Sequence, residues 1–107
     1  KTQINFGDVP SSPALEEHVN QEVDRTLKRF SERLTRVEVH LHDDKSKKAG
    51  AADQRCMMEA RPAGRDPIAV EASDRDIYAA VKHAAEKLER AVAHRIEREK
   101  DKEKDRA

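Results

Sequence analysis

Apolar residues recur every three or four positions along two long stretches of this chain and alternate with polar residues along four short ones. In the last third, residues 73–98 carry an apolar stripe at helical spacing, made by Ile77, Val81, Ala84, Ala85, Leu88, Val92 and Ile96. At about 100° per residue these positions fall on one side of a helix, which predicts its buried face. Ser73 is placed to cap this helix, with Asp76 three residues later as in a capping box.

A second helical pattern lies near the N-terminus. Ser12 is a typical N-cap residue, and Pro13 suits the first helical position, where its missing N–H costs no hydrogen bond. The pattern predicts one helix of about 22 residues that begins at Pro13. Its buried stripe consists of Leu15, Val19, Val23, Leu27, Phe30 and Leu34.

Four short stretches alternate apolar and polar side chains, which is typical of strands with one buried face. They span residues 2–6, 36–42, 55–61 and 68–72. The inward positions are predicted to be Val37, Val39 and Leu41 in the second stretch and Cys56, Met58 and Ala60 in the third.

The predicted order of elements is therefore β-α-β-β-β-α. A strand-helix-strand start favours a right-handed crossover with the first two strands parallel. Because each helix and the sheet have one apolar face, we expect an α+β fold, a four-stranded mixed sheet with two long helices packed on one face. This arrangement is similar to a double-stranded RNA-binding domain. Residues 1–98 are expected to form one domain, followed at 99–107 by a charged, disordered tail or frayed helix end.

The composition limits the core and the kinds of partner. Of the 107 residues, 36% are hydrophobic and 41% are charged, so one modest core is available beneath a very polar surface. Aromatic residues are only 3% of the chain, which argues against an RNA-binding platform of stacked aromatic rings. Acidic and basic residues both total 22, yet residues 25–36 contain five bases and one acid. The neutral sum hides segregated charge.

Candidate catalytic and metal chemistry is sparse. Cys56 is the single cysteine and lies on a predicted inward face, and no common catalytic motif is present. Four possible metal ligands are close in sequence, His40, His42, Asp43 and Asp44. A metal needs three or four converging ligands, so we expect an exposed polar sheet face instead. We predict no enzyme activity, no metal or cofactor and no small-molecule substrate. No membrane segment is evident, and a cytoplasmic protein is expected.

Basic side chains gather on both predicted helices. Those of the C-terminal helix lie opposite its buried stripe and are His83, Lys87, Arg90, His94 and Arg98. Those of the N-terminal helix are Arg25, Lys28, Arg29 and Arg33. Neighbouring helices would bring the two sets together, at spacings that suit the phosphates of a structured RNA. Each set also has a purely structural explanation, as a solvated charged face or as cations favoured near a helix C-terminus.

Two separated segments resemble one known family. The run 76–81, Asp-Ile-Tyr-Ala-Ala-Val, followed by Lys-Leu-Glu-Arg at 87–90, resembles the last helix of the ribosome hibernation promoting factor family. This family is also called ribosome-associated inhibitor or sigma-54 modulation protein. Residues 12–15, Ser-Pro-Ala-Leu, and His-Val at 18–19 resemble the start of its first helix. The resemblance covers about residues 2–98 and implies the same fold.

The resemblance implies a factor that binds the small ribosomal subunit and its 16S rRNA, in 30S or 70S particles. Such factors occupy the tRNA and mRNA channel between head and body and silence idle ribosomes under stress or in stationary phase, by steric occlusion. Lys87 and Arg90 stand on the matching motif. The chain resembles the short form of the family, and a monomer is expected off the ribosome. Two alternatives stay open, a protein-interaction regulator of transcription and a general binder of structured RNA.

Overall fold

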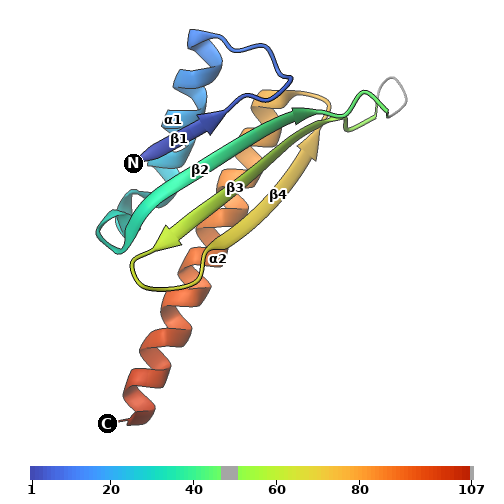
Figure 1. The fold of residues 1–107 in the computed structure, drawn as a ribbon. Coiled ribbons are helices and arrows are strands. Elements are labelled where there is room, and N and C mark those ends of the chain that lie inside the picture. The colour runs from blue at the N-terminus through green and yellow to red at the C-terminus, as the bar shows by residue number, and fades with distance from the viewer. Residues whose placement is uncertain (47–50, 107) are drawn as a thin grey trace.

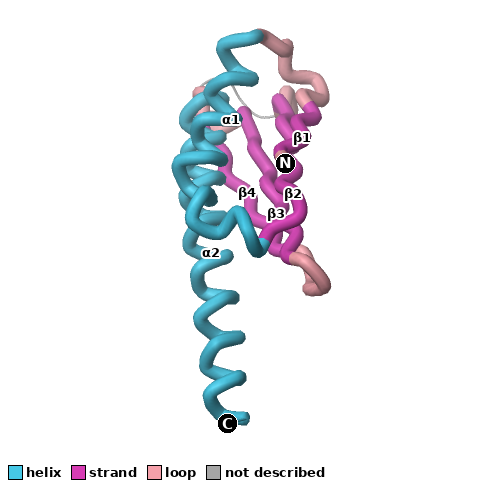
Figure 2. The backbone as a smooth tube through the Cα atoms, turned by 90° about the vertical axis from the view of Figure 1, so that its left-hand side faces the viewer, coloured by secondary structure: helices cyan, strands magenta, loops and turns pink. Residues whose placement is uncertain are grey.

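The computed structural model describes residues 1–46 and 51–106, which form a two-layer α+β fold (Figure 1). The element order confirms the predicted β-α-β-β-β-α arrangement, with a short 3-10 helix, η1, after the first helix. The elements are β1 (Thr2–Asn5), α1 (Pro13–Leu27), η1 (Lys28–Arg33), β2 (Leu34–Asp43), β3 (Gln54–Pro62), β4 (Ile68–Asp74) and α2 (Ile77–Arg106). Figure 2 shows that both helices cover the same face of the sheet and leave the other face open.

The strands follow one another across the sheet in the order β1-β2-β3-β4. β1 is parallel to β2, and the two later pairs are antiparallel, as the crossover and hairpin connections predict. Val39 lies opposite Ile4 on one side and Met58 on the other, and Met58 lies opposite Val70. This register places the predicted inward residues in one layer beneath the helices.

The core lies between the sheet and the two helices. Val19, Val39, Met58, Val81 and Leu88 have no exposed surface, and each was predicted to face inward. α2 packs against β3, β4 and α1, so its apolar stripe is the centre of the core. Cys56 is also fully buried, and burial raises the pKa of its thiol to about 12, which leaves it a poor nucleophile.

The first helix begins as predicted and ends earlier. The Ser12 hydroxyl accepts a hydrogen bond from the Leu15 N–H at 3.1 Å, and Pro13 occupies the first turn. The α-helix stops at Leu27, so the prediction of a continuous helix of about 22 residues was wrong. The buried Thr26 hydroxyl donates to the Glu22 carbonyl at 2.7 Å, a back-bond that often bends helices. η1 then tightens the chain and still buries Phe30.

The second helix begins later than predicted. Ser73 pairs with Arg55 inside the sheet, so its assignment as the N-cap was wrong. Asp76 takes that place, because its Oδ1 accepts a hydrogen bond from the Tyr78 N–H at 3.0 Å. Asp74 in turn accepts from the Asp76 N–H at 3.0 Å. Two consecutive carboxylate turns therefore hold the chain extended through Asp74 and delay the helix.

α2 continues well past the sheet. The C-terminal part of α2, which ends at Arg106, projects from the body of the molecule, as Figures 1 and 2 show. Residues 97–102 alternate acidic and basic residues and contain no apolar one. The last residue of the predicted tail, Ala107, lies outside the described residues. A helix of this composition gains its local support from opposite charges three residues apart rather than from a core.

The open face of the sheet carries a cluster of ion pairs, which we call the sheet-face cluster: Arg36, Glu38, Glu59 and Arg61. Arg36 lies 2.8 Å from Glu38, and Arg61 lies 3.1 Å from Glu38 and 2.7 Å from Glu59. Glu38 and Glu59 are direct cross-strand neighbours, an arrangement that would be repulsive without these arginines. The cluster therefore neutralises itself within the sheet.

Gly7 is required by the backbone where the chain leaves β1. Its φ is 56°, and a Cβ there would lie 2.6 Å from the Leu41 carbonyl oxygen. We expect Gly7→Ala to destabilise the fold by about 1–3 kcal/mol or more, because the cost of the strained backbone is added to the cost of the clash with main-chain atoms. Urea unfolding would measure this. Gly64→Ala is the matched control, because Gly64 also has positive φ (69°) but open space around it. Equal losses in the two variants would contradict the importance of the Leu41 contact.

Candidate nucleic-acid interface

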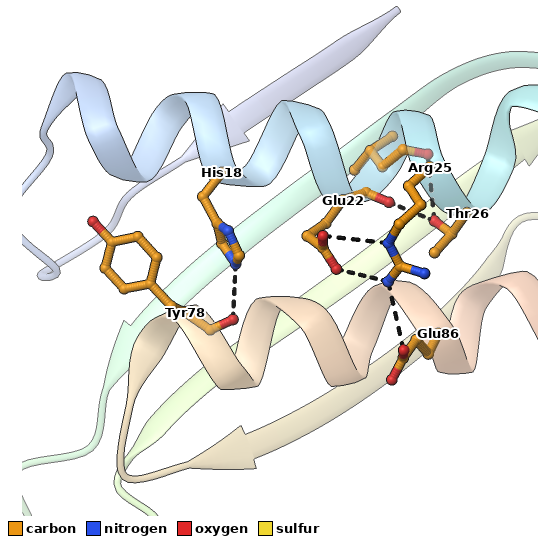
Figure 3. Close-up of polar contacts among 7 residues, drawn as sticks. His18, Glu22, Arg25, Thr26, Tyr78 and Glu86 are labelled. Carbon is orange, nitrogen blue, oxygen red and sulfur yellow. Dashed lines mark hydrogen bonds and ion pairs between the residues drawn. The ribbon is translucent and has the colours of Figure 1, made fainter.

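The two helices lie side by side and run in the same direction. At their beginnings, the His18 ring nitrogen Nε2 lies 2.9 Å from the Tyr78 carbonyl oxygen, and the two rings pack 4.9 Å apart (Figure 3). Further along, Arg25 reaches Glu86 at 3.5 Å, and Arg29 reaches Glu89 at 3.7 Å. The basic end of α1 and the η1 turn therefore lie beside the middle of α2.

Of the basic residues predicted on the first helix, two already have carboxylate partners. Figure 3 shows Arg25 between Glu22, at 2.7 Å, and Glu86. The hydrogen bond from Arg25 lowers the pKa of the Glu22 carboxyl below its ordinary value, against the opposing effect of desolvation. Arg29 pairs with Glu89 and also lies over the Phe30 ring at 4.2 Å. These two guanidinium groups are therefore partly occupied before any phosphate arrives.

Lys28 and Arg33 are different. Both are exposed, and like Arg29 they lie on η1 rather than on the α-helix, where all three were predicted. Neither side chain makes a hydrogen bond or an ion pair with the side chains described, those of residues 1–46 and 51–102. Together with Arg25 and Arg29 they form what we call the α1 cluster.

The basic residues predicted on the second helix are all exposed, which confirms their orientation. We call them the outer row: His83, Lys87, Arg90, His94 and Arg98. His83 lies 3.9 Å from Asp74, and the Lys87 amine donates to the Glu71 carbonyl oxygen at 2.9 Å. Arg90, His94 and Arg98 have no such partner in the described part of the chain. Two arginines and one histidine of the row are therefore available to an external anion.

The two sets share one layer, but acidic residues lie between them. Glu86 and Glu89, which we call the acidic strip, belong to α2 and reach across to α1. The sequence places them three residues apart on one helix, but their role depends on which helix face meets α1. The two basic sets were expected to lie near each other on neighbouring helices, and the acidic strip lies on the side of α2 that faces the α1 cluster. The helix layer thus carries two basic bands. Between them lies a seam, the contact of α1 and η1 with α2, where Glu86 and Glu89 pair with arginines.

This arrangement suits an extended polyanion rather than a small ligand. Successive members of the outer row stand about one helical turn apart, roughly 5–6 Å. Lysine and arginine at such spacing can contact several backbone phosphates without reading a base. In the described residues, no group of three or more His, Cys, Asp or Glu side chains is arranged to hold a metal ion. Neither helix carries an apolar stretch that could cross a lipid bilayer within residues 1–46 and 51–106.

Comparison with known proteins identifies the family to which this chain belongs. The sequence model of the family described as sigma 54 modulation protein / S30EA ribosomal protein matches residues 2–104. The chain belongs to this family. The match spans both helices, the whole sheet and most of the projecting part of α2, so the S30EA family assignment rests on the entire fold rather than on one motif. It confirms the resemblance seen in the two helical segments.

Solved structures agree with the S30EA fold. A ribosomal subunit interface protein from Coxiella burnetii is 21% identical with a TM-score of 0.72, covering 89% of this chain and 97% of that one. The N-terminal domain of Protein Y from Thermus thermophilus is 26% identical with a TM-score of 0.60, covering 82% and 88%. At 21% identity, the similarity to the Coxiella protein establishes the fold alone. Comparison with curated protein sequences gives no significant match.

Proposed function

We propose that this protein binds the small ribosomal subunit through its helix layer and inhibits translation by occupying the tRNA and mRNA channel. The observation that carries the proposal is the outer row, whose Arg90, His94 and Arg98 are exposed and unpaired within the described residues on the helix layer of an S30EA-family fold. The structures of similar fold include one named as a ribosomal subunit interface protein. Binding of 16S rRNA phosphates would use the outer row and the α1 cluster.

The physical basis of this binding is local charge rather than net charge. The chain as a whole is neutral, so no general attraction to nucleic acid is available. Cations confined to one face can still displace counterions from RNA phosphates, provided that the RNA matches the surface in shape. The sparse aromatic content fits recognition of backbone and shape. Inhibition then follows from occupancy and requires neither a cofactor nor a catalytic group, and it would act in the cytoplasm on idle ribosomes during stress.

Sucrose-gradient co-sedimentation with purified small subunits tests the proposal. We expect the protein to migrate with small subunits at low salt, to dissociate as salt rises, and to inhibit translation in a cell-free assay. Purified large subunits are the control. Absence from the small-subunit fractions, or binding that is insensitive to salt, would overturn the proposed mode. Light scattering of the free protein would check the expected monomer.

The description of the family also favours a second function, modulation of sigma-54 transcription through a protein partner. Such an interface would bury apolar as well as charged surface, so its salt dependence would be shallow. A steep loss of binding with salt would favour the ribosome, and a shallow one would favour the protein partner. Equal affinity for naked duplex RNA and for small subunits would instead favour a general binder of structured RNA.

The acidic strip should limit affinity for RNA. Glu86→Gln together with Glu89→Gln removes the ion-pair partner of Arg29 and the more distant of the two partners of Arg25, which keeps its ion pair with Glu22. The Arg29 guanidinium therefore becomes free for a phosphate, and the negative charge beside Arg25 is reduced. We expect binding to small subunits to tighten by roughly 3–10-fold, which corresponds to about 0.6–1.4 kcal/mol and is the scale of one or two exposed ion pairs. Fluorescence anisotropy of labelled protein with small subunits would measure the change.

The matched control for this prediction is Glu16→Gln with Glu17→Gln. These exposed residues lie on α1 away from the seam and change the net charge by the same amount. If both double variants tighten binding equally, the effect is one of total charge and the proposed competition at the seam is wrong.

A further inference from the structure

A groove lies where α2 leaves the body of the protein. It has a volume of about 230 Å3 and runs between α2, the beginning of β2 and the turn that joins β3 to β4. Its floor is apolar and consists of Leu34, Pro62, Ile68, Val92 and Ile96. Leu34 and Ile96 remain partly exposed although both border the core. In a chain that is 41% charged, partly exposed aliphatic side chains gathered in one concave place are unusual.

Guanidinium groups line the rim of this groove. Arg95 donates a hydrogen bond to the Asp66 carbonyl oxygen at 3.1 Å, which ties α2 to the β3–β4 turn. Arg65 lies 3.7 Å from Glu99, a long and exposed ion pair. Arg33 lines the other side and makes no hydrogen bond or ion pair in the described part of the chain. The rim thus carries three positive charges against one negative charge, above an aliphatic floor.

We propose that this groove binds a segment of another protein in which one or two large apolar side chains are flanked by aspartate or glutamate. The apolar side chains would be removed from water by the floor, which is the main driving force for such contacts. The neighbouring carboxylates would pair with the planar guanidinium groups of Arg33 and Arg65, a geometry that arginine favours. Because the rim has a net positive charge, the bound segment is expected to be negatively charged. The groove shares Arg33 with the α1 cluster, and its other lining residues lie outside the α1 cluster and the outer row.

Other occupants fit the groove less well. A volume of about 230 Å3 lies below the roughly 300–1,000 Å3 of sites for drug-sized ligands and cofactors. A nucleobase would meet an aliphatic floor without an aromatic ring on which to stack. The projecting part of α2 from a second copy could supply charges, but residues 97–102 contain no apolar side chain to fill the floor. An acidic segment with apolar anchors satisfies both parts of the groove.

The test uses the full chain, labelled with 15N, and the synthetic peptide Gly-Asp-Asp-Leu-Phe-Asp-Glu-Gly. We expect saturable shifts of the Ala63 and Ile96 amide signals, with a dissociation constant below about 1 mM. A second peptide, in which serine replaces the Leu and Phe, should bind about tenfold more weakly or worse, since it lacks the apolar anchors. A third peptide, with Asn and Gln in place of its acids, should also bind more weakly.

Variants of the rim complete the experiment. Arg33→Gln with Arg65→Gln should weaken the first peptide by several-fold, whereas Arg90→Gln, an exposed arginine outside the groove, should have no effect. The absence of saturable shifts up to about 1 mM would overturn the proposal. So would equal binding of the serine peptide, or stronger binding of a uridine pentanucleotide at the same amides, which would make the groove part of an RNA surface.

Discussion

Reversing two charges of the outer row, by Lys87→Glu together with Arg90→Glu, should leave the fold intact and weaken binding to small ribosomal subunits by roughly 10–100-fold at moderate salt. Both side chains are exposed, and Lys87 loses only an exposed hydrogen bond to the Glu71 carbonyl. Each lost phosphate contact should also lower the slope of log affinity against log salt by about one. Anisotropy titrations at three salt concentrations would measure both quantities.

Circular dichroism and thermal unfolding would first establish that the double variant is folded. The matched control is Lys1→Glu with Lys45→Glu, which makes the same change in net charge at exposed positions outside the helix layer. A folded double variant that still co-sediments like the wild type would remove the outer row from the interface. An equal loss in the control would show that total charge, rather than this row, governs binding.

Leu88→Ala should produce the largest loss of stability. Leu88 has no exposed surface and belongs to the apolar stripe of α2, which packs on β3, β4 and α1. Truncation removes its buried methyl groups and leaves a cavity, which costs about 2–5 kcal/mol. For a domain of this size, that loss corresponds to a fall in melting temperature of roughly 10–30 °C. Calorimetry or fluorescence-monitored urea unfolding would give the value.

Glu97→Ala on the exposed side of the same helix is the control for Leu88→Ala and should change stability by less than about 0.5 kcal/mol. Below its melting temperature, the Leu88→Ala variant should still bind small subunits, because Leu88 does not reach the surface. Loss of binding by a folded variant would indicate that Leu88 also positions the outer row.

Local signals were sufficient to predict most of the fold. Ser12 and Pro13 mark the beginning of α1 because a hydroxyl and a missing N–H act only on neighbouring backbone. Strict alternation around Val39 and Met58 predicted the buried side of the sheet, since a strand has a period of two.

The errors arose where several local signals compete. Ser73 is an acceptable cap, but the carboxylates of Asp74 and Asp76 bind nearby N–H groups and keep Ser73 in the sheet. The end of α1 at Leu27 could not be predicted, because the apolar spacing through Phe30 is compatible with both an α-helix and a 3-10 turn.

The candidate site was only partly accessible from the sequence. Exposure of the outer row follows from helical periodicity alone, and the structure confirms it. The pairing of Glu86 and Glu89 with α1 depends on the direction and rotation of two packed helices, which no local pattern contains. The groove at Ile96 likewise combines residues from distant parts of the chain.

The sheet-face cluster determines which charges this protein would present to solvent when it is bound to a ribosome through its helices. If the helices face rRNA, the surface turned outward bears Arg36 and Arg61 with their charges cancelled by Glu38 and Glu59. Such a multipole fades within a few ångströms, well inside the Debye length of about 10 Å at 0.1 M salt. An incoming tRNA would therefore meet a surface with almost no electrostatic attraction for its phosphates. Displacement of the bound protein would have to begin at the helix face that contacts the rRNA.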